Sequence, residues 1–304
     1  MMTESKPNLC INKAQVTCNN GTLGMSRYLR AYIDSGEFNI TYHNEFIRSS
    51  RGNRATILYY NKKKIYLDFW EYPTPTYSNN VIDGDFDLII KLQHRKMTVD
   101  HYLNFLRRKN IFSSKTDEEL ESFYNKIVPY SFFPSKLMFP YEGKAKLPSF
   151  KITQDAFFCG KGWRCRKNFK KDFKRQGIEY IVSEQDVQKE ITDDIFLEKM
   201  LRSKYGLAIQ GRSVAITDSK NRREIDYMIL KKPLLLTYRP YYYNDLIPGH
   251  HYIFYDGKTK VKDLEKKYDL KTIAENGYQW YLANATKEAL PKVFKQITKE
   301  KLGV

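Results

Sequence analysis

The sequence predicts an α/β protein with two Rossmann-like halves that face a cleft. Three observations support this prediction. The order strand, loop, helix, strand occurs over residues 8–42, and it occurs again over residues 155–183. Between these stretches, residues 127–150 contain four prolines and show no clear period. The repeated order is typical of parallel α/β sheets, and a proline-rich crossing is typical of a domain boundary. We therefore expect domains at 1–140 and 150–275.

The composition supports two cores of ordinary size. Hydrophobic residues make up 41% of the 304 residues and aromatic residues 15%, which excludes a globally disordered chain. No apolar run approaches the roughly 20 residues that span a bilayer, and the N-terminus lacks the apolar stretch of a secretory signal. We expect a cytoplasmic protein whose four cysteines are free thiols and do not bind metal.

The chain is strongly basic. It has 52 Lys and Arg against 35 Asp and Glu, a net charge of +17. Such a charge attracts polyanions, but the basic residues are spread along the whole chain. This distribution does not favour a nucleic-acid partner, although folding can still bring basic residues together.

In the first half, Asn8–Asn12 reads as a buried strand, and a polar loop with two glycines follows it. Met25–Asp34 has apolar residues at helical spacing, and Gly36 ends this helix. Phe38–Tyr42 is the next strand. Further strands are expected at 55–60, 64–69 and 86–92, and helices at 100–107 and 117–126.

In the second half, a strand at Asp155–Cys159 leads through a glycine loop into a basic helix over Cys165–Gln176. Gly177 ends this helix before a strand at Ile178–Ser183. The remaining pattern predicts strands at 207–210, 214–217, 234–237 and 251–255, helices at 221–231 and 260–268, and a long helix or broken pair over 277–302 that is split near Pro291.

Three pieces of the second half suit an anionic ligand, and each follows a predicted strand. Glycine lets the backbone approach a phosphate closely, arginine offers two parallel N–H donors, and a helix N-terminus attracts negative charge. We expect a nucleotide diphosphate here. The alternative is a turn beside an ordinary basic surface. The pieces are Gly160-Lys161-Gly162-Trp163-Arg164, Gly211-Arg212 and Asn221-Arg222-Arg223-Glu224.

The segment Tyr205–Tyr255 resembles the C-terminal half of GT-B glycosyltransferases, in particular exostosin-like enzymes and capsule-associated and protein O-glucosyltransferases. The resemblance rests on a strand, a loop with arginine, the block Arg222–Leu236 and the aromatic loop Tyr241–Leu246. Without a signal segment, the chain is similar to the soluble xylosyltransferases of large algal DNA viruses, which act on capsid glycans. The first half matches only in topology.

This resemblance implies a GT-B fold whose last helix, 277–304, packs back on the first domain. It implies inverting transfer from a UDP-sugar, with UDP-xylose as the first choice, to a glycan hydroxyl. Arginine and lysine would stabilise the leaving diphosphate without a metal or cofactor. Arg222 and Arg223 would neutralise the diphosphate, Glu224 or Asp226 would hold ribose or sugar hydroxyls, and Arg164 and Arg212 are further candidates for the leaving-group charge.

A metal-dependent alternative rests on the acidic stretch Asp83–Asp87, which is similar to the DxD motif of GT-A enzymes. In that fold the motif follows an apolar strand, whereas here the acids precede one. We therefore interpret Asp83–Asp87 as a turn with solvated carboxylates.

Inverting transfer needs a base that takes the acceptor proton. Asp68 and Glu71 lie at a predicted strand end among aromatic residues, which stack on sugars and raise a carboxylate pKa. His94 ends another strand. The alternatives are a cap or an ion pair for Asp68 and a surface role for His94. Weaker candidates are His43, Glu45 and His101.

A rival function is nucleic-acid binding without catalysis, through the positive charge and stacking tyrosines and phenylalanines. No RNA-recognition, KH or zinc-finger pattern supports it. The sequence leaves open whether the sugar is transferred with inversion or retention, and which acceptor receives it.

Overall fold

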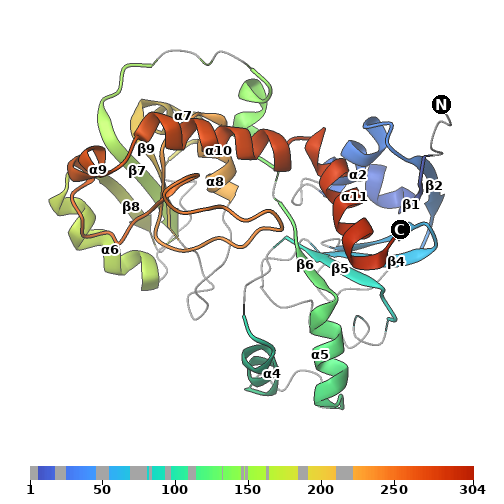
Figure 1. Ribbon diagram of the computed structural model, residues 1–304. Coiled ribbons are helices and arrows are strands. Elements are labelled where there is room, and N and C mark those ends of the chain that lie inside the picture. Colours follow the sequence, from blue (N-terminus) through green and yellow to red (C-terminus); the bar gives the residue numbers. More distant parts are fainter. Residues whose placement is uncertain are drawn as a thin grey trace. The chain divides into compact units, whose positions relative to one another are not determined.

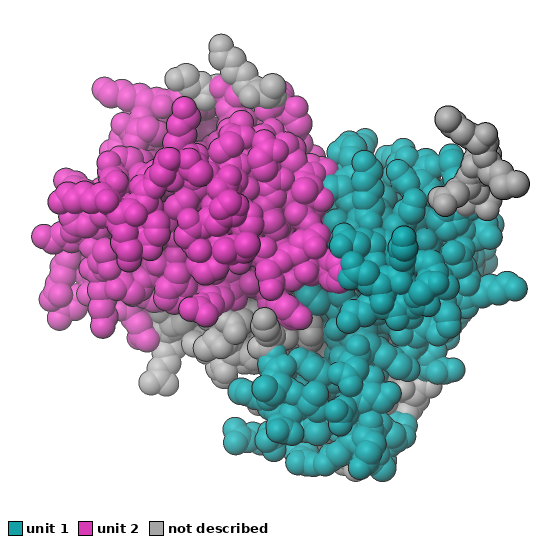
Figure 2. All heavy atoms as spheres, viewed as in Figure 1, with its two compact units in different colours: residues 1–131, 287–304 teal, residues 132–286 magenta. Residues whose placement is uncertain are grey.

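The computed structural model divides the chain into two compact units, residues 1–131 with 287–304 and residues 132–286 (Figure 2). Each unit contains its own sheet and helices, which confirms the predicted α/β class. The structure describes residues 6–17, 25–45, 55–68, 81, 84–92, 97–108, 114–131, 133–144, 147, 150–161, 164–183, 191–209 and 222–304.

The sheet of the first unit has six strands in the order β2-β1-β3-β4-β5-β6 (Figure 1). All of them run parallel except β3, which is antiparallel to both of its neighbours. The parallel sheet that the repeated strand order indicates therefore includes one antiparallel strand. Asn61 and Lys62 adopt positive φ angles of 46° and 70°, as a tight hairpin turn between β3 and β4 requires. The strands are β1 (Asn8–Asn12), β2 (Asn39–His43), β3 (Ala55–Tyr60), β4 (Lys63–Asp68), β5 (Leu88–Lys91) and β6 (Ile127–Pro129).

Helices cover both faces of this sheet. On one face, α4 (Val99–Arg108) and α5 (Asp117–Asn125) bury a core that includes Tyr66 and Ile89. On the other, Phe294 of α11 (Ala289–Leu302) packs against aromatic rings of α2 (Met25–Asp34) and the sheet. The short helix α1 (Lys13–Thr17) follows β1 directly. The C-terminal helix thus belongs to the first unit.

The second unit has a wholly parallel sheet in the order β11-β10-β9-β7-β8. The chain goes from β7 to β8 in one direction and from β9 to β10 and β11 in the other. The strand order therefore reverses between β7 and β9, which is where doubly wound sheets bind ligands. The strands are β7 (Gln154–Lys161), β8 (Glu179–Ser183), β9 (Ser203–Ala208), β10 (Leu234–Leu236) and β11 (Ile253–Phe254).

Helices also cover both faces of the second sheet. Phe173 of α6 (Arg164–Arg175) and Val261 of α9 (Val261–Lys267) belong to the core of one face. On the opposite face, α7 (Asp193–Arg202) lies against β7 and β9, and α8 (Arg222–Ile229) lies against β9 and β10. The long helix α10 (Leu270–Asn284) packs against α8.

Several element boundaries differ from expectation. Helix α7 was not predicted, and β6 lies within the stretch expected to be only a crossing. The C-terminal pair of helices is interrupted at residues 285–288, and Pro291 lies in the first turn of α11, where its missing N–H has no helical partner to lose. The expected strand at 214–217 lies outside the described residues.

Among the described residues, Cys10 and Cys159 are free thiols, as expected. None of the helices in this part of the chain has the length and apolar character needed to cross a bilayer.

Candidate functional site

Two helices begin at the point where the strand order of the second unit reverses. Strand β7 ends at Lys161 and α6 begins at Arg164, while β9 ends at Ala208 and α8 begins at Arg222. Helix N-termini present unpaired N–H groups and partial positive charge, so this carboxyl edge of the sheet suits an anion. It is also the edge on which the sequence placed the nucleotide diphosphate.

Two arginine side chains lie against the same aromatic ring at this edge. The guanidinium carbons of Arg223 and Arg166 are 4.8 and 5.1 Å from the centroid of the Phe158 ring. Arg166 also donates from Nη2 to the Ile209 carbonyl at 3.4 Å. Desolvation lowers the pKa of Arg223, but a guanidinium remains charged in proteins. The edge therefore holds two cations whose positions are fixed by packing.

Arg166 was not among the residues predicted from the sequence. It is the second arginine of the Arg164-Cys165-Arg166 start of α6, so the signal was present in the helix predicted there. Its neighbour Gly160 was predicted. A Cβ atom at Gly160 would lie only 2.7 Å from Nη1 of Arg166, so the missing side chain makes room for the guanidinium.

The structure locates the other predicted cations only in part. Arg164 and Arg222 are the first residues of α6 and α8, and Lys161 is the last residue of β7. The side chains of these three residues lie outside the described part of the chain, as do Trp163 and Arg212 altogether.

Glu224 is fully buried and has partners within the protein. Its two carboxylate oxygens accept hydrogen bonds from the hydroxyls of Tyr238 and Tyr242. Burial, followed by the charge of Glu224, raises the pKa of Tyr238 well above its usual value, so this tyrosine stays a donor. Glu224 thus ties the first turn of α8 to the segment that follows β10, and its expected contact with ribose or sugar hydroxyls stays a prediction.

Asp226 is also held by the protein. It is 3% exposed, and its Oδ1 accepts a hydrogen bond of 2.7 Å from the backbone N–H of Ser135. Ser135 precedes the 3-10 helix η1 (Lys136–Tyr141), so the carboxylate fixes the start of that helix to α8. The expected contact of Asp226 with ribose or sugar hydroxyls also stays a prediction.

The segment after β10 is fixed at its far side by α10. The rings of Tyr242 and Trp280 meet edge to face with centroids 4.8 Å apart. Trp280 donates from Nε1 to the Asn244 carbonyl at 3.0 Å. The Glu224–Tyr242 contact is therefore supported by packing on α10, which keeps the arginine edge in one arrangement.

In the first unit, Asp68 and Lys91 form a buried ion pair at the carboxyl ends of the neighbouring strands β4 and β5. The distance from Nζ to Oδ2 is 2.8 Å, and both side chains are 0% exposed. Desolvation lowers the pKa of Lys91, although Asp68 opposes this effect. Asp68 thus lies at a strand end, as expected, but its carboxylate is buried and paired with Lys91, away from solvent. Glu71 and His94 lie outside the described residues.

Other buried polar residues gather at the same edge. Asn12 ends β1, Gln15 follows it, and Thr56 lies near the start of the antiparallel β3. The amide nitrogen of Gln15 donates to the Ala55 carbonyl at 2.9 Å, whereas its Oε1 has no hydrogen-bond partner among the described residues. A buried acceptor without a donor is costly, so a polar group of a ligand or water at this edge would be favoured.

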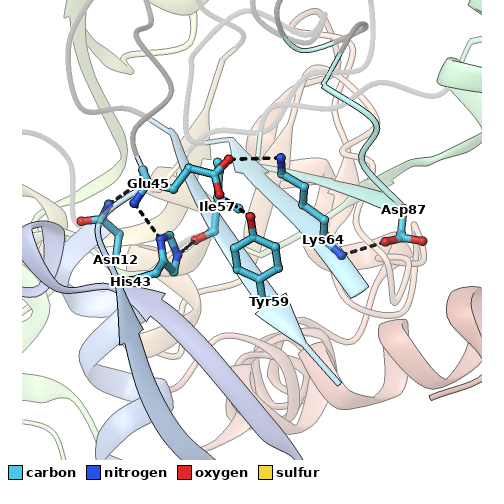
Figure 3. Close-up of polar contacts among 7 residues, drawn as sticks. All are labelled: Asn12, His43, Glu45, Ile57, Tyr59, Lys64 and Asp87. Carbon is cyan, nitrogen blue, oxygen red and sulfur yellow. Dashed lines mark hydrogen bonds and ion pairs between the residues drawn. The ribbon is translucent and has the colours of Figure 1, made fainter. Parts of the chain in front are cut away.

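His43 and Glu45, two of the weaker base candidates, lie together where β2 ends (Figure 3). The backbone N–H of Glu45 donates to Nδ1 of His43 at 3.0 Å, and Nε2 lies 3.1 Å from the Ile57 carbonyl. With Nδ1 as the acceptor of this bond, Nε2 is the nitrogen that can donate to the Ile57 carbonyl. Since both ring nitrogens have protein partners, His43 is poorly placed to act as a base.

The Glu45 carboxylate reaches over the sheet toward Tyr59 and Lys64 (Figure 3). It accepts from the Tyr59 hydroxyl and lies 3.1 Å from Nζ of Lys64, while its side chain remains 41% exposed. Partial burial acts to raise the pKa of Glu45, but the hydrogen bonds from Tyr59 and Lys64 outweigh it and lower the pKa. Partial burial and Glu45 together raise the pKa of Tyr59 to about 12. Glu45 is thus an ionised carboxylate that solvent can reach.

In the acidic stretch before β5, the carboxylate of Asp87 is bound by groups of the protein itself. Asp87 accepts from the backbone N–H of Lys64 at 2.7 Å and pairs with Nζ of Lys63 at 3.2 Å. Asp83 lies outside the described residues. Within the residues that the structure describes, no three His, Cys, Asp or Glu side chains are grouped as metal ligands.

His251 makes the second unit sensitive to acid. Burial, then the neighbouring His250, lowers the pKa of His251 to about 4, and its Nδ1 accepts from the Ile247 N–H at 2.9 Å. The unfolded chain binds this proton near pH 6.5, so the stability that the neutral ring contributes is lost as pH falls from 6.5 toward 4. We expect His251→Asn to flatten the fall in melting temperature between about pH 7 and pH 5. The exposed His101 gives the control variant His101→Asn, and equal slopes in all three proteins would contradict the assignment.

The chain was also compared with known proteins. No family model and no curated protein matches it. Among solved structures, it is similar to the pneumococcal O-GlcNAc transferase GtfA crystallised with UDP and GlcNAc, at 10% identity and a TM-score of 0.38. The match covers 90% of this chain and 55% of that protein, so this chain spans little more than half its length. A likeness this weak establishes no activity.

Proposed function

We propose that the chain is a GT-B glycosyltransferase that moves a sugar from a UDP-sugar to a hydroxyl group of a glycan. The observation that carries this proposal is the pair Arg166 and Arg223 on the ring of Phe158, where the strand order of a parallel sheet reverses. Two fixed cations beside two helix N-termini suit a diphosphate. The block Arg222–Leu236, which contains Arg223 and resembles GT-B enzymes, agrees with this proposal.

The proposed chemistry follows from the charge that develops during transfer. Cleavage of the bond between the sugar and the phosphate leaves negative charge on the diphosphate, and fixed cations stabilise it without reorganising. We propose that Arg166 and Arg223 supply this stabilisation without a metal and that the sugar is transferred with inversion. By resemblance, UDP-xylose is the first donor to test, and a glycan on a viral capsid protein in the host cytoplasm is the first acceptor.

For the base, we propose Glu45 ahead of Asp68. Glu45 is exposed and ionised, whereas Asp68 is buried and paired with Lys91. The lowered pKa of Glu45 makes it a weaker base than a carboxylate with a pKa near neutrality. We therefore propose that Glu45 also holds the acceptor hydroxyl in place. Glu71 and His94 remain candidates for the same role.

The test is a transfer assay with UDP-xylose, UDP-glucose and UDP-GlcNAc and a set of glycan acceptors, with and without EDTA. The proposal predicts that one donor is consumed, that the new bond has the opposite anomeric configuration, and that EDTA has no effect. Glu45→Gln should reduce turnover by about 100-fold, the usual contribution of a general base. Hydrolysis or transfer that EDTA abolishes would contradict the metal-independent chemistry, and full activity of Glu45→Gln would remove Glu45 as base.

Gly160→Ala is expected to weaken nucleotide binding without unfolding the protein. The added Cβ would lie 2.7 Å from Nη1 of Arg166 and 3.1 Å from Cζ of Phe158, so the end of the Arg166 side chain would have to shift from its place on the ring. We expect the melting temperature of the free protein to change little and the affinity for UDP to fall about tenfold, equivalent to about 1.4 kcal/mol. Calorimetric titration with UDP measures this change. Unaltered affinity would show that the position of Arg166 does not matter for binding.

A further inference from the structure

Helix α6 carries a continuous stripe of exposed positive charge. Lys167, Lys170, Lys171 and Lys174 follow the spacing i, i+3, i+4 and i+7, so they lie along one side of the helix. All four are exposed. The one acid on the helix, Asp172, is partly buried and lies 3.9 Å from Arg175. Within this unit, the stripe belongs to the helix that begins at the proposed nucleotide edge.

A second basic segment lies beside the end of this helix. Gln176 accepts hydrogen bonds at Oε1 from the Tyr255 hydroxyl and the Val261 N–H, and it donates to the Gly257 carbonyl at 3.1 Å. These contacts hold the turn at residues 256–262 against α6. The exposed cations of this turn are Lys258, Lys260 and Lys262.

Among the described residues, the nearby acids offset only part of this charge. Asp256 uses its carboxylate within the turn, where it accepts from the backbone N–H groups of Lys258 and Thr259. Asp263 pairs with Lys266 on α9 at 3.2 Å. We call the eight exposed cations of α6 and this turn the basic face: Lys167, Lys170, Lys171, Lys174, Arg175, Lys258, Lys260 and Lys262.

The basic face can attract a partner through its positive charge, and the apolar side of α6 does not contribute to it. The rings of Phe169 and Phe173 on α6 stack on each other at 5.3 Å, and Phe173 stacks on Tyr255, so the apolar side of the helix is committed to the core. Seven of the eight residues of the basic face are lysines. Lysine is a point charge that lacks the rigid two-donor fork of arginine, so a lysine-rich face favours a dense array of phosphates over bidentate contacts to single groups, and stacking on single strands needs exposed rings.

We propose that the basic face docks the protein on an anionic phospholipid surface. A flat, dense array of lipid headgroup phosphates and carboxylates needs no stacking or bidentate contacts, and it can engage cations from two separate segments together. Since the apolar side of α6 is buried, the contact is electrostatic and does not insert into the bilayer. This inference does not depend on the proposed transferase activity.

The test is co-sedimentation of the full-length protein with vesicles of phosphatidylcholine alone or with roughly 30% phosphatidylserine, at about 100 mM salt. The proposal predicts binding to the anionic vesicles only. The variant K170E/K171E/K174E should bind at least ~10-fold more weakly. The control K292E/K299E/K301E changes three exposed lysines of α11, so it has the same net charge, and its binding should change less than ~3-fold.

Three outcomes of these experiments would overturn the proposal. Equal losses in the two triple variants would assign binding to the overall charge of +17 and not to this face. No preference for anionic vesicles would exclude the membrane, and tight binding to duplex RNA that only the α6 variant loses would identify nucleic acid as the partner. If the charge reversal impairs folding, K170Q/K171Q/K174Q applies the same test with neutral side chains.

Discussion

Replacing Lys91 by methionine is expected to lower the free energy of unfolding by about 3–5 kcal/mol. Lys91 and Asp68 are both 0% exposed, and their charged atoms are 2.8 Å apart. The substitution leaves the Asp68 carboxylate buried without its cation, so the desolvation of that charge is no longer offset. Denaturation in urea, followed by circular dichroism, measures the loss.

Two further variants separate this cause from a general effect of substitution. Lys91→Met combined with Asp68→Leu removes both charges and should recover most of the lost stability, since a buried pair is often replaced by apolar residues at little cost. Lys295→Met breaks the partly exposed pair with Glu37 and should cost less than about 1 kcal/mol. A Lys91→Met variant as stable as the parent would contradict the buried pair.

Glu224→Ala is expected to destabilise the second unit by about 3–5 kcal/mol. The substitution leaves the hydroxyls of Tyr238 and Tyr242 without their acceptor in a buried place. It also removes a negative charge near Arg166 and Arg223, two cations whose charges act to lower the pKa of Tyr238. The single variants Tyr238→Phe and Tyr242→Phe, which remove one hydrogen bond to a charged group each, should cost about 1.5–3 kcal/mol.

This experiment also distinguishes the structural role of Glu224 from the ligand role implied by the resemblance. Unfolding curves give the stability, and titration with UDP gives the affinity of the folded fraction. The structure predicts a large loss of stability in both tyrosine variants and in Glu224→Ala. A stable Glu224→Ala protein that has lost only its affinity for UDP would restore the expected contact with ribose or sugar hydroxyls.

Much of the fold could be predicted because local patterns and tertiary structure agree. The spacing of Met25–Asp34 and the acidic start at Asp117 define helices α2 and α5, and the latter begins with a capping box between Thr116 and Glu119. The direction of β3 could not be predicted from the pattern of its residues, because parallel and antiparallel strands share one period. The turn at Asn61-Lys62 decides it, and two positive φ angles are not obvious in a lysine-rich sequence.

The candidate site was predicted less completely, because contacts across the sheet decide it. Glycine and arginine beside helix starts identified Gly160 and Arg223. The role of Glu224 depends on tyrosines 14 and 18 residues away, and that of Asp226 on a backbone N–H that is 91 residues away. Sequence spacing gives no access to such partners. In the same way, Asp68 reads as a lone acid at a strand end until β5 places Lys91 beside it.

The central claim is that the arginine edge of the second unit binds the diphosphate of a UDP-sugar, and a thermal-shift titration with UDP tests it most directly. At about 100 times its dissociation constant, UDP should add about 2.7 kcal/mol of stability, with or without EDTA, and GDP, ADP and CMP should add less. Arg166→Lys and Arg223→Lys should each reduce the shift, whereas Arg239→Lys, at an exposed residue against Phe254, should not. No shift with any nucleotide, or equal shifts in all three variants, would contradict the account.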